Sequence, residues 1–301
     1  IALAFAATAL GTFPLILFGN EEQKKRYLAK IAKGTIAAFA LTEAEAGSDA
    51  GSIKTQAVKD GNHYVINGTK QWITNAGEAD VYTVITITDK SKGARGATAF
   101  IVEKGTKGMD FGKKEKKLGI RGSATREVVF TDCRVPKENI LGREGMGFIV
   151  AMKTFDYSRP GVAAQAVGIA QRALDEAVNY AHQRKQFGQS ISSFQGIQFM
   201  LADMSIQVEA ARALVYRAAQ IIDAGCKDIA KISAIAKTFA SDVAMKVTTD
   251  AIQVLGGYGY MRDYPVEKLM RDAKITQIYE GTNQIQRGVI AANLIKELKK
   301  K

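Results

Sequence analysis

The hydrophobic pattern of this chain changes its period twice, and this change constrains the fold more than any single motif. Residues 1–33 have a helical pattern that breaks near Gly19 and Asn20. From Thr35 to Pro136, short alternating runs rich in Val, Ile, Thr and Gly predict strands. From about Gly145 the pattern is helical again. We therefore expect a multidomain α+β protein: the end of a helical domain in residues 1–34, a small β-barrel or sandwich in residues 35–137, and a helical bundle in residues 138–301.

Individual elements follow from local signals in the middle segment. Asn67-Gly68 lies between two alternating runs, a pattern typical of a tight hairpin turn. Further strands are predicted over Val81–Thr88, Ala97–Val102 and Arg126–Val135.

The C-terminal segment contains several long amphipathic stretches. Pro160 is placed to open a helix at its first turn. Later helices are predicted over Phe194–Ala224, Asp228–Leu255 and Val266–Tyr279, and a last helix begins near Thr282.

Composition bounds the class of protein. With 47% hydrophobic and 24% charged residues among 301, the chain can bury an ample core as a globular protein. Two cysteines and two histidines, far apart, indicate neither a disulfide framework nor a metal site. The net charge of +12 comes without aromatic residues between the lysines and without a nucleic-acid motif, so solvated faces are expected, or attraction of polyanionic small molecules or an acidic protein.

The N-terminal stretch from Ile1 to Ala9 is apolar and resembles the interior of a buried helix. It lacks the basic flank of a signal peptide, and Gly11 and Pro14 shorten it below the length of a membrane span. We expect the chain to begin inside a domain, and we expect no integral membrane segment.

The candidate chemistry centres on Glu280, in the stretch IYEGTNQIQR of residues 278–287. Thr282 can cap the helix that follows. Burial would raise a carboxyl pKa at this place, whereas the amide end of a helix would lower it. Such a group suits a base that removes a weakly acidic C–H proton, and a solvated Glu at a helix start is the alternative. The apolar positions of the helix fall on one face: Ile285, Val289, Ile290 and Leu294.

Three other stretches could bind a cofactor. The loop of small residues from Ala40 to Ser52 offers backbone N–H groups and hydroxyls to a ring or phosphate, or is a plain turn. Trp72, with Thr74 on the same face of a strand, could stack on a flat cofactor, although a lone Trp is more often core. The glycines at 256, 257 and 259 end a helix and permit close backbone approach beyond a simple C-cap, but no strand precedes them as in a Rossmann fingerprint.

Together, three motifs resemble the acyl-CoA dehydrogenase family: TEAEAGSD, GGYGY with the downstream MRDAK, and YEGTNQIQR. The resemblance covers nearly the whole chain and favours short- and medium-chain, butyryl-CoA dehydrogenase-like members. It implies the end of an N-terminal helical domain, a middle β-barrel and a C-terminal four-helix bundle. It also implies FAD as cofactor, a homo-oligomer that is a dimer of dimers, and no metal.

The resemblance assigns the catalytic base to Glu280, which would remove the α-proton of the thioester while the β-hydride passes to the flavin. Some family members carry the base at the position of Ser158, which is not a carboxylate here, so Glu280 keeps the role. FAD contacts are implied at Phe39, Leu41, Thr42, Gly47, Ser48, Trp72, Thr74, Tyr279, Thr282 and Gln284. Contacts to the FAD of a neighbouring subunit are implied at Arg184, Gln186, Phe187, Gln195, Gln253, Gly256 and Gly257. Acyl-CoA contacts are implied at Ser48, Phe155, Asp156, Arg159 and Gly281.

The expected function is therefore α,β-desaturation of an acyl-CoA, with electrons passed to an electron-transferring flavoprotein during fatty acid β-oxidation. The alternatives are an enoyl-CoA or aryl-acrylyl-CoA reductase that runs in reverse, an acyl-CoA oxidase, and an inactive truncated fragment that only assembles with partners. The expected location is the bacterial cytoplasm, or the mitochondrial matrix in a eukaryote.

Overall fold

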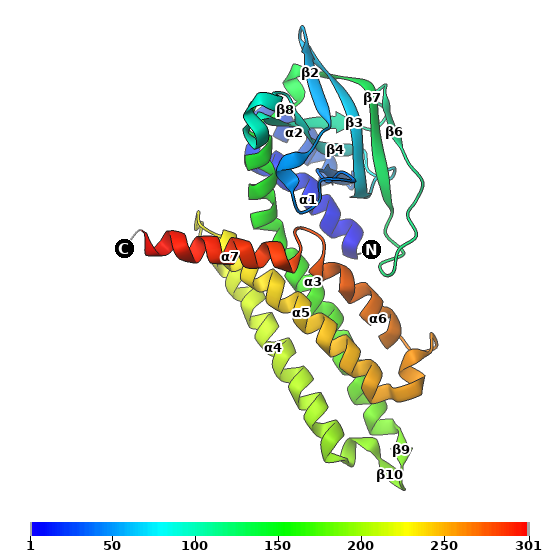
Figure 1. The fold of residues 1–301 in the computed structure, drawn as a ribbon. Coiled ribbons are helices and arrows are strands. Elements are labelled where there is room, and N and C mark those ends of the chain that lie inside the picture. The colour runs from blue at the N-terminus through cyan, green and yellow to red at the C-terminus, as the bar shows by residue number, and fades with distance from the viewer. Residues whose placement is uncertain (1, 300–301) are drawn as a thin grey trace. The chain divides into compact units, whose positions relative to one another are not determined.

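The computed structural model describes residues 2–299 and divides into two compact units (Figure 1). Unit 1 comprises residues 1–117 and 121–158, and unit 2 comprises residues 118–120 and 159–301. Helix α3 (Gly147–Gln183) contributes to both. Within the described residues, no helix is both long enough and apolar enough to span a membrane.

Unit 1 combines two N-terminal helices with a mixed sheet. The strand order is β6-β7-β3-β2-β4-β5-β8, and β1 pairs in parallel with β4. All seven residues of β4 and all four of β1 are buried, which explains why apolar residues and threonines make up these strands. The elements are α1 (Ala2–Phe18), α2 (Glu21–Ile31), β1 (Ala37–Ala40), β2 (Gln56–Asp60), β3 (His63–Thr74), β4 (Val81–Ile87), β5 (Ala97–Glu103), β6 (Met109–Phe111), β7 (Thr125–Pro136) and β8 (Ile140–Leu141).

The predicted hairpin turn at Asn67-Gly68 is wrong. Strand β3 continues through both residues, and the hairpin lies at the β2–β3 connection, where Asp60 pairs with His63. Gly68 instead marks a shift in the register between β3 and β7. A Cβ there would lie 2.6 Å from the Thr55 hydroxyl, so the glycine serves close packing within the sheet.

The N-terminal helices pack on this sheet. Gly11 of α1 faces β1 so closely that a Cβ would lie 2.7 Å from the Ala38 nitrogen. The predicted break near Gly19 and Asn20 is present, because Asn20 and Gln23 form a capping box that starts α2.

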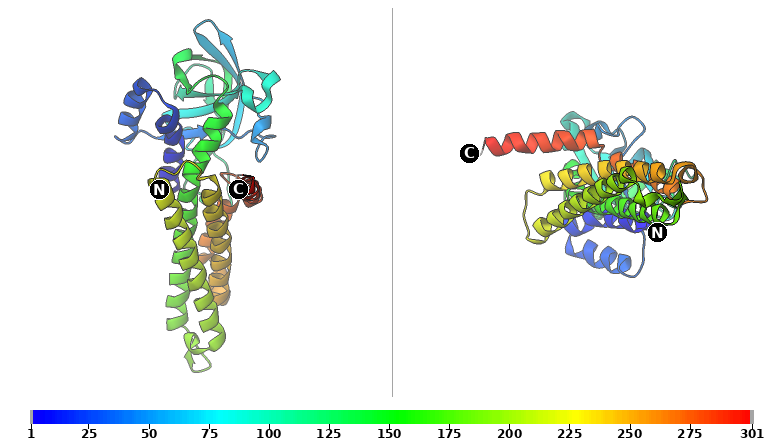
Figure 2. Two further views of the ribbon diagram at one scale, coloured as in Figure 1. Left: turned by 90° about the vertical axis from the view of Figure 1, so that its left-hand side faces the viewer. Right: turned by 90° about the horizontal axis from the view of Figure 1, so that it is seen from below.

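Unit 2 is helical. Figure 2 shows α3, α4 and α5 running side by side, and fully buried alanines such as Ala170, Ala211 and Ala244 allow them to approach closely. A short hairpin of β9 and β10 follows α3. The elements are α3, β9 (Lys185–Gln186), β10 (Gln189–Ser190), α4 (Gln195–Asp223), α5 (Ala230–Leu255), α6 (Val266–Ala273) and α7 (Asn283–Leu298), with 3₁₀ turns at Gly256–Tyr260 and Lys274–Gln277.

Two local predictions in this half of the chain need correction. Pro160 does not open a helix but lies inside α3, which begins at Gly147. The helix predicted over Val266–Tyr279 ends at Ala273 and continues only as a 3₁₀ turn. On α7, the apolar Ile285 is 37% and Leu294 49% exposed.

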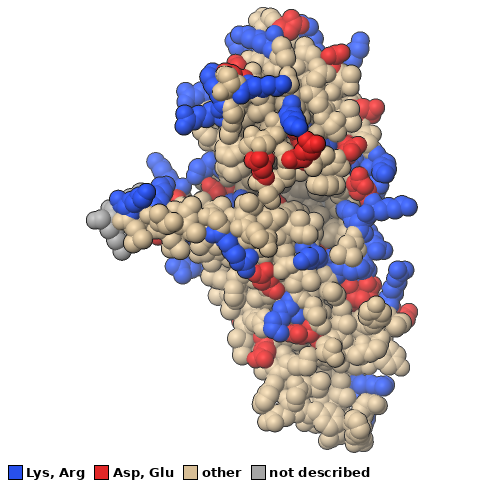
Figure 3. Space-filling model, in the orientation of Figure 1, with Lys and Arg blue, Asp and Glu red and all other residues tan. Residues whose placement is uncertain are grey.

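Charge is spread over the surface. On the face shown in Figure 3, Lys and Arg side chains are interspersed with Asp and Glu. This distribution is typical of solvated faces and shows no continuous basic track of the kind that follows a nucleic-acid backbone on this face.

Candidate active site

The predicted base lies on a tight turn between the 3₁₀ segment Lys274–Gln277 and α7. Glu280 has φ 52° and Gly281 has φ 90°, so two consecutive residues are left-handed. Thr282 ends the turn as the N-cap of α7 and accepts a bond from the Ile285 N–H at 3.3 Å, as predicted. A left-handed glutamate is strained and persists only where its surroundings enforce it.

Side chains from three helices enforce this turn. The Glu280 carbonyl accepts bonds at 3.2 Å from Arg159 Nε on α3 and from Gln286 Nε2 on α7. The Gly281 carbonyl accepts bonds from Gln286 Nε2 at 3.0 Å and from Lys237 Nζ on α5 at 2.8 Å. A Cβ on Gly281 would lie 2.5 Å from Gln286 Nε2 and would displace that amide, and the φ of 90° favours glycine.

Tyr279 fixes the other side of the turn. Its hydroxyl donates to Gln165 Oε1 on α3. Burial raises the pKa of Tyr279 far above its ordinary value, the Glu280 charge raises it further, and the bond to Gln165 opposes them. The phenol therefore keeps its proton and its anchoring bond at all working pH values.

A second group of predicted residues comes together within unit 2. A pocket of about 530 Å³ is lined by Arg184, Gln186, Gly256 and Gly257, among others. The Arg184 guanidinium lies 5.4 Å from the ring centre of Tyr258, which also lines the pocket. Gly256 ends α5 with φ 61°, and a Cβ on either glycine would meet nothing within 4 Å, so the backbone is open to a ligand.

The other predicted residues near this pocket are exposed. Phe187, on the β9–β10 hairpin, has φ 52° and is 93% exposed, with its ring edge-on to Phe194. Gln195 and Gln253 are exposed at the start of α4 and in the last turn of α5. Exposed apolar and polar groups of this kind suit contact with another molecule.

Within unit 1, the predicted cofactor residues lie on β1, on the loop after it and on β3. Phe39 and Leu41 are buried, and Phe39 packs edge-on against Phe155 with ring centres 5.6 Å apart. The Thr42 carbonyl accepts a bond from the Gln71 N–H at 2.8 Å, which ties the loop to β3. Gly47 and Ser48 lie exposed farther along this loop.

Trp72 is not a core residue, contrary to the more frequent role of a lone Trp. It is 57% exposed and has φ 56°, at a second register shift of β3 between Lys70 and Ile73. Thr74 is half-buried. The irregular strand therefore turns a large aromatic surface outward, as a stacking role requires.

The predicted acyl-CoA contacts at Asp156 and Arg159 are 7% and 4% exposed. The structure gives Arg159 a contact that the sequence did not reveal, the bond to the Glu280 carbonyl. The sequence reasoning also missed Lys70, Lys237 and Gln286, which are fully buried. The position of Lys237 within the otherwise small and apolar residues 232–240 is the one signal that could have pointed to it.

Comparisons with known proteins agree with the geometry. The acyl-CoA dehydrogenase C-terminal, middle and N-terminal domains match residues 145–295, 38–133 and 1–35. The crystal structure of butyryl-CoA dehydrogenase from Megasphaera elsdenii is 53% identical, with a TM-score of 0.96 over 97% of this chain and 77% of that one.

Two further relatives are similar over most of their length. A structure from work on the electron transferring flavoprotein of Acidaminococcus fermentans and flavin-based electron bifurcation is 55% identical, with a TM-score of 0.95 over 97% of this chain and 77% of that one. Acryloyl-CoA reductase (NADH) of Anaerotignum propionicum is 52% identical over 93% of this chain and 71% of its own length. The expected α+β multidomain fold is confirmed, and the chain belongs to the acyl-CoA dehydrogenase family of oxidoreductases.

Proposed function

We propose that this chain is an FAD-dependent acyl-CoA dehydrogenase that desaturates a short- or medium-chain acyl-CoA between its α- and β-carbons. The observation that carries the proposal is the turn at Glu280: a carboxylate on a left-handed residue, with its own carbonyl and that of Gly281 held by buried side chains. A base fixed in this way meets a substrate proton with little reorganisation.

In this proposal each residue of the turn has a role. Glu280 takes the α-proton of the thioester. Its backbone N–H donates to the thioester carbonyl and stabilises the negative charge that develops as the proton leaves. Gly281 allows the left-handed backbone beside the base, and Tyr279 holds the turn through Gln165. The bound FAD supplies the acceptor for the hydride that leaves the β-carbon.

The side chains fit FAD in two places. In unit 2, the pocket beside Gly256 combines open backbone with Arg184, whose planar fork matches phosphate oxygens. In unit 1, Trp72 presents an exposed indole, and Thr42 and Ser48 add hydroxyls. We assign the flavin ring to the unit 1 residues and the adenosine diphosphate portion to the unit 2 pocket of a neighbouring subunit.

The remaining residue assignments and the domain limits 1–34, 35–137 and 138–301 belong to the same proposal. For the flavin side they are Phe39, Leu41, Gly47, Thr74, Tyr279, Thr282 and Gln284; for the neighbouring subunit, Gln186, Phe187, Gln195, Gln253 and Gly257; for acyl-CoA, Ser48, Phe155, Asp156, Arg159 and Gly281.

The proposal includes partners. A homo-oligomer is supported by the exposed apolar side chains of Phe187 and of Leu294, Ile295 and Leu298 on α7. An electron-transferring flavoprotein is proposed as the electron acceptor, supported by the similarity to the Acidaminococcus structure. A bacterial cytoplasmic location is the corresponding expectation.

The reverse reaction is the second candidate. It is favoured by the similarity to acryloyl-CoA reductase, because the same base can return a proton to the α-carbon when electrons arrive from a partner. The residues of the turn serve either direction.

The test is an anaerobic visible spectrum of the purified protein before and after butyryl-CoA is added. A flavin spectrum that bleaches supports the dehydrogenase, and Glu280→Gln is expected to keep the flavin but lose the bleaching. Glu22→Gln, an exposed position on α2, is the matched control. The reductase is supported if saturated acyl-CoAs do not bleach the flavin but enoyl- or acrylyl-CoA reoxidises it after chemical reduction. Folded protein that takes up no FAD contradicts both.

A further inference from the structure

Lys237 is a buried amine that contacts the backbone of the turn and has no assigned part in the proposed proton and hydride transfer. It lies in the middle of α5, and its side chain is 0% exposed. Its Nζ donates to the Gly281 carbonyl at 2.8 Å and to Asn283 Oδ1 at 2.9 Å. Both acceptors belong to the short segment that begins with the proposed base, so the amine ties this segment to the bundle.

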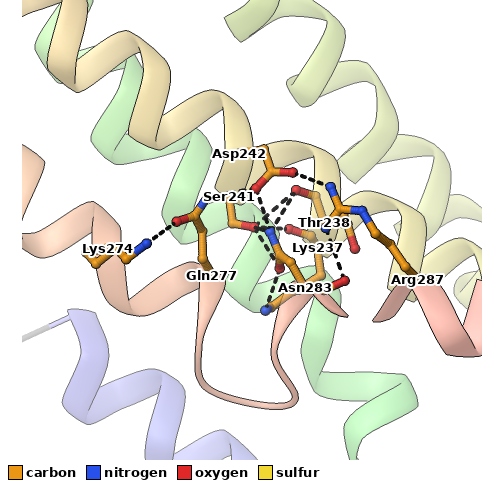
Figure 4. Close-up of polar contacts among 8 residues, drawn as sticks. All are labelled: Lys237, Thr238, Ser241, Asp242, Lys274, Gln277, Asn283 and Arg287. Atoms are coloured by element: carbon orange, nitrogen blue, oxygen red, sulfur yellow. Dashed lines mark hydrogen bonds and ion pairs between the residues drawn. The ribbon is translucent and has the colours of Figure 1, made fainter. Parts of the chain in front are cut away.

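Asn283 extends this contact into a network, shown in Figure 4. Its Nδ2 donates to Ser241 Oγ at 2.9 Å and to Asp242 Oδ1 at 2.7 Å. Asp242 also accepts bonds from Gln277 Nε2 at 2.7 Å and from Arg287 Nη2 at 2.9 Å. Residues on both sides of the turn are therefore joined to one stretch of α5.

The contact of Lys237 is made where the backbone is strained. The Gly281 carbonyl belongs to the second residue of the left-handed pair Glu280–Gly281. The direction of this carbonyl is therefore linked to the orientation of Glu280. Gln286 also binds this carbonyl, but from α7, which directly follows the turn in the chain. Lys237 binds it from α5, which is packed in the bundle core. The Lys237 amine thus anchors the Gly281 carbonyl to a helix that lies outside the turn.

We propose that Lys237 is a positioning residue for Glu280, which acts by fixing the Gly281 carbonyl and the start of α7 from the bundle. This inference rests on the proposed function. It assigns no contact with the substrate to Lys237, which acts through the turn.

The charges around the amine give the proposal a measurable signature. Burial lowers the pKa of Lys237 to about 7, the Glu280 charge raises it, the Arg159 charge on α3 lowers it, and the Asp242 charge raises it. Arg287 on α7 offsets part of the Asp242 charge by pairing with it at 2.9 Å. A neutral amine still has two N–H donors for its two acceptors, so loss of the proton removes the charge and keeps both bonds.

The expected effect on the reaction follows from the sign of this charge. Proton abstraction removes the negative charge of Glu280, and a positive charge nearby opposes that loss. The rate of flavin bleaching at saturating butyryl-CoA should therefore rise as the pH passes through about 7. An amine is distinguished from a carboxyl group by temperature, because ionisation of an amine absorbs much heat and its pKa falls on warming, whereas that of a carboxyl group barely changes.

The experiment compares wild-type protein with Lys237→Met, and Lys246→Met, at an exposed lysine of the same helix, is the control. Flavin content, the rate of bleaching and the substrate concentration for half-maximal rate are measured from about pH 6 to about pH 9. We expect Lys237→Met to keep its flavin, to bleach about tenfold to a hundredfold more slowly, and to lose the pH limb near 7. The half-saturating concentration should change little, and Lys246→Met should behave as wild type.

The outcomes separate the two proposals. Wild-type flavin that no acyl-CoA bleaches overturns the proposed function. A wild type that bleaches, together with Lys237→Met that bleaches equally fast with the same pH profile, overturns only the role of Lys237. If Lys237→Met does not fold, the wild-type profile decides: a limb near pH 7 whose pKa falls on warming supports the amine, and its absence, or a limb that ignores temperature, contradicts it.

Discussion

Among the residues that the structure describes, each unit buries one lysine completely, and these two lysines differ in what accepts their hydrogen bonds. Lys70 in unit 1 donates to the Leu41 carbonyl at 2.9 Å and to the Glu43 carboxylate at 2.8 Å. Lys237 in unit 2 donates to the Gly281 carbonyl and to the amide oxygen of Asn283, and both of these acceptors are uncharged. Both thus hold backbone beside predicted site residues, one with an ion pair and one without.

This difference decides which lysine titrates near neutral pH. Burial lowers the pKa of both, and the Glu43 charge and hydrogen bond restore that of Lys70 to about 8, whereas that of Lys237 is about 7. Burial would raise the pKa of Glu43, but the Lys70 charge and the bonds from Lys70, Thr55 and Lys54 more than offset it, so the pKa is lowered. The unit 1 pair is therefore ionised at neutral pH and structural, while Lys237 changes its charge there.

The largest effect is expected when the ion pair of unit 1 is broken. Lys70→Met leaves Glu43 as a buried charge without its cation, and removal of one partner of such a pair costs about 3–5 kcal/mol of folding free energy. Urea unfolding followed by circular dichroism measures the loss. The double variant Lys70→Met with Glu43→Gln should recover part of it, because no uncompensated charge remains. A Lys70→Met protein as stable as wild type would contradict the comparison.

A smaller loss is expected for Lys237→Met in the same assay. Its two acceptors are uncharged, and the Gly281 carbonyl keeps a bond from Gln286. The loss of two such bonds should cost about 1–2 kcal/mol. A cost equal to that of Lys70→Met would show that Lys237 is paired as an ion, and the contrast between the units would fail.

The pH dependence of stability sharpens the contrast further. Above about pH 7 the folded protein has lost the Lys237 proton, while the unfolded chain keeps it up to its ordinary value of 10.5. The unfolded state then binds more protons, so wild-type stability rises with pH by at most about 1.4 kcal/mol per pH unit from this group. Lys237→Met should lack this rise, and Lys70 should add its own only above about pH 8. Equal slopes in wild type and Lys237→Met would contradict the lowered pKa.

The smallest effect is expected at the cap of α7. Thr282→Ala removes the acceptor for the Ile285 N–H, and at a distance of 3.3 Å this cap should contribute about 0.5–1 kcal/mol. Thermal unfolding is a sufficient measurement. A loss greater than that of Lys237→Met would place the main support of the turn in its cap, not in α5.

Much of the fold follows from the sequence because it depends on local periodicity. The change from alternating to helical patterns separates the sheet region from the bundle, and Thr282 and Gly256 end or begin helices where their chemistry predicts. The error at Asn67-Gly68 has a different origin. A glycine needed for a turn and a glycine needed because Thr55 packs against it look alike in a sequence.

The polar support of the site could not be read from the sequence. Asn283 and Gln286 are buried in α7 while the apolar Ile285 and Leu294 are exposed, the reverse of the amphipathic pattern. Burial of a polar side chain depends on partners from other helices, here Lys237 and the carbonyl of Glu280. Such partners lie far apart along the chain, so no local rule finds them.

The turn at Glu280 is held by side chains of α3, α5 and α7 together, so substitutions in the helical core can affect its geometry. Each helix contributes a hydrogen bond that positions the turn. The geometry of the turn therefore depends on how the helices of this unit pack against one another. A volume change between α4 and α5, far along the bundle from any ligand, would reach the base as a small displacement. A substitution in the bundle core should then change the catalytic rate more than it changes the folding stability. Fewer substitutions should therefore be tolerated in this core than the burial of its residues alone would predict.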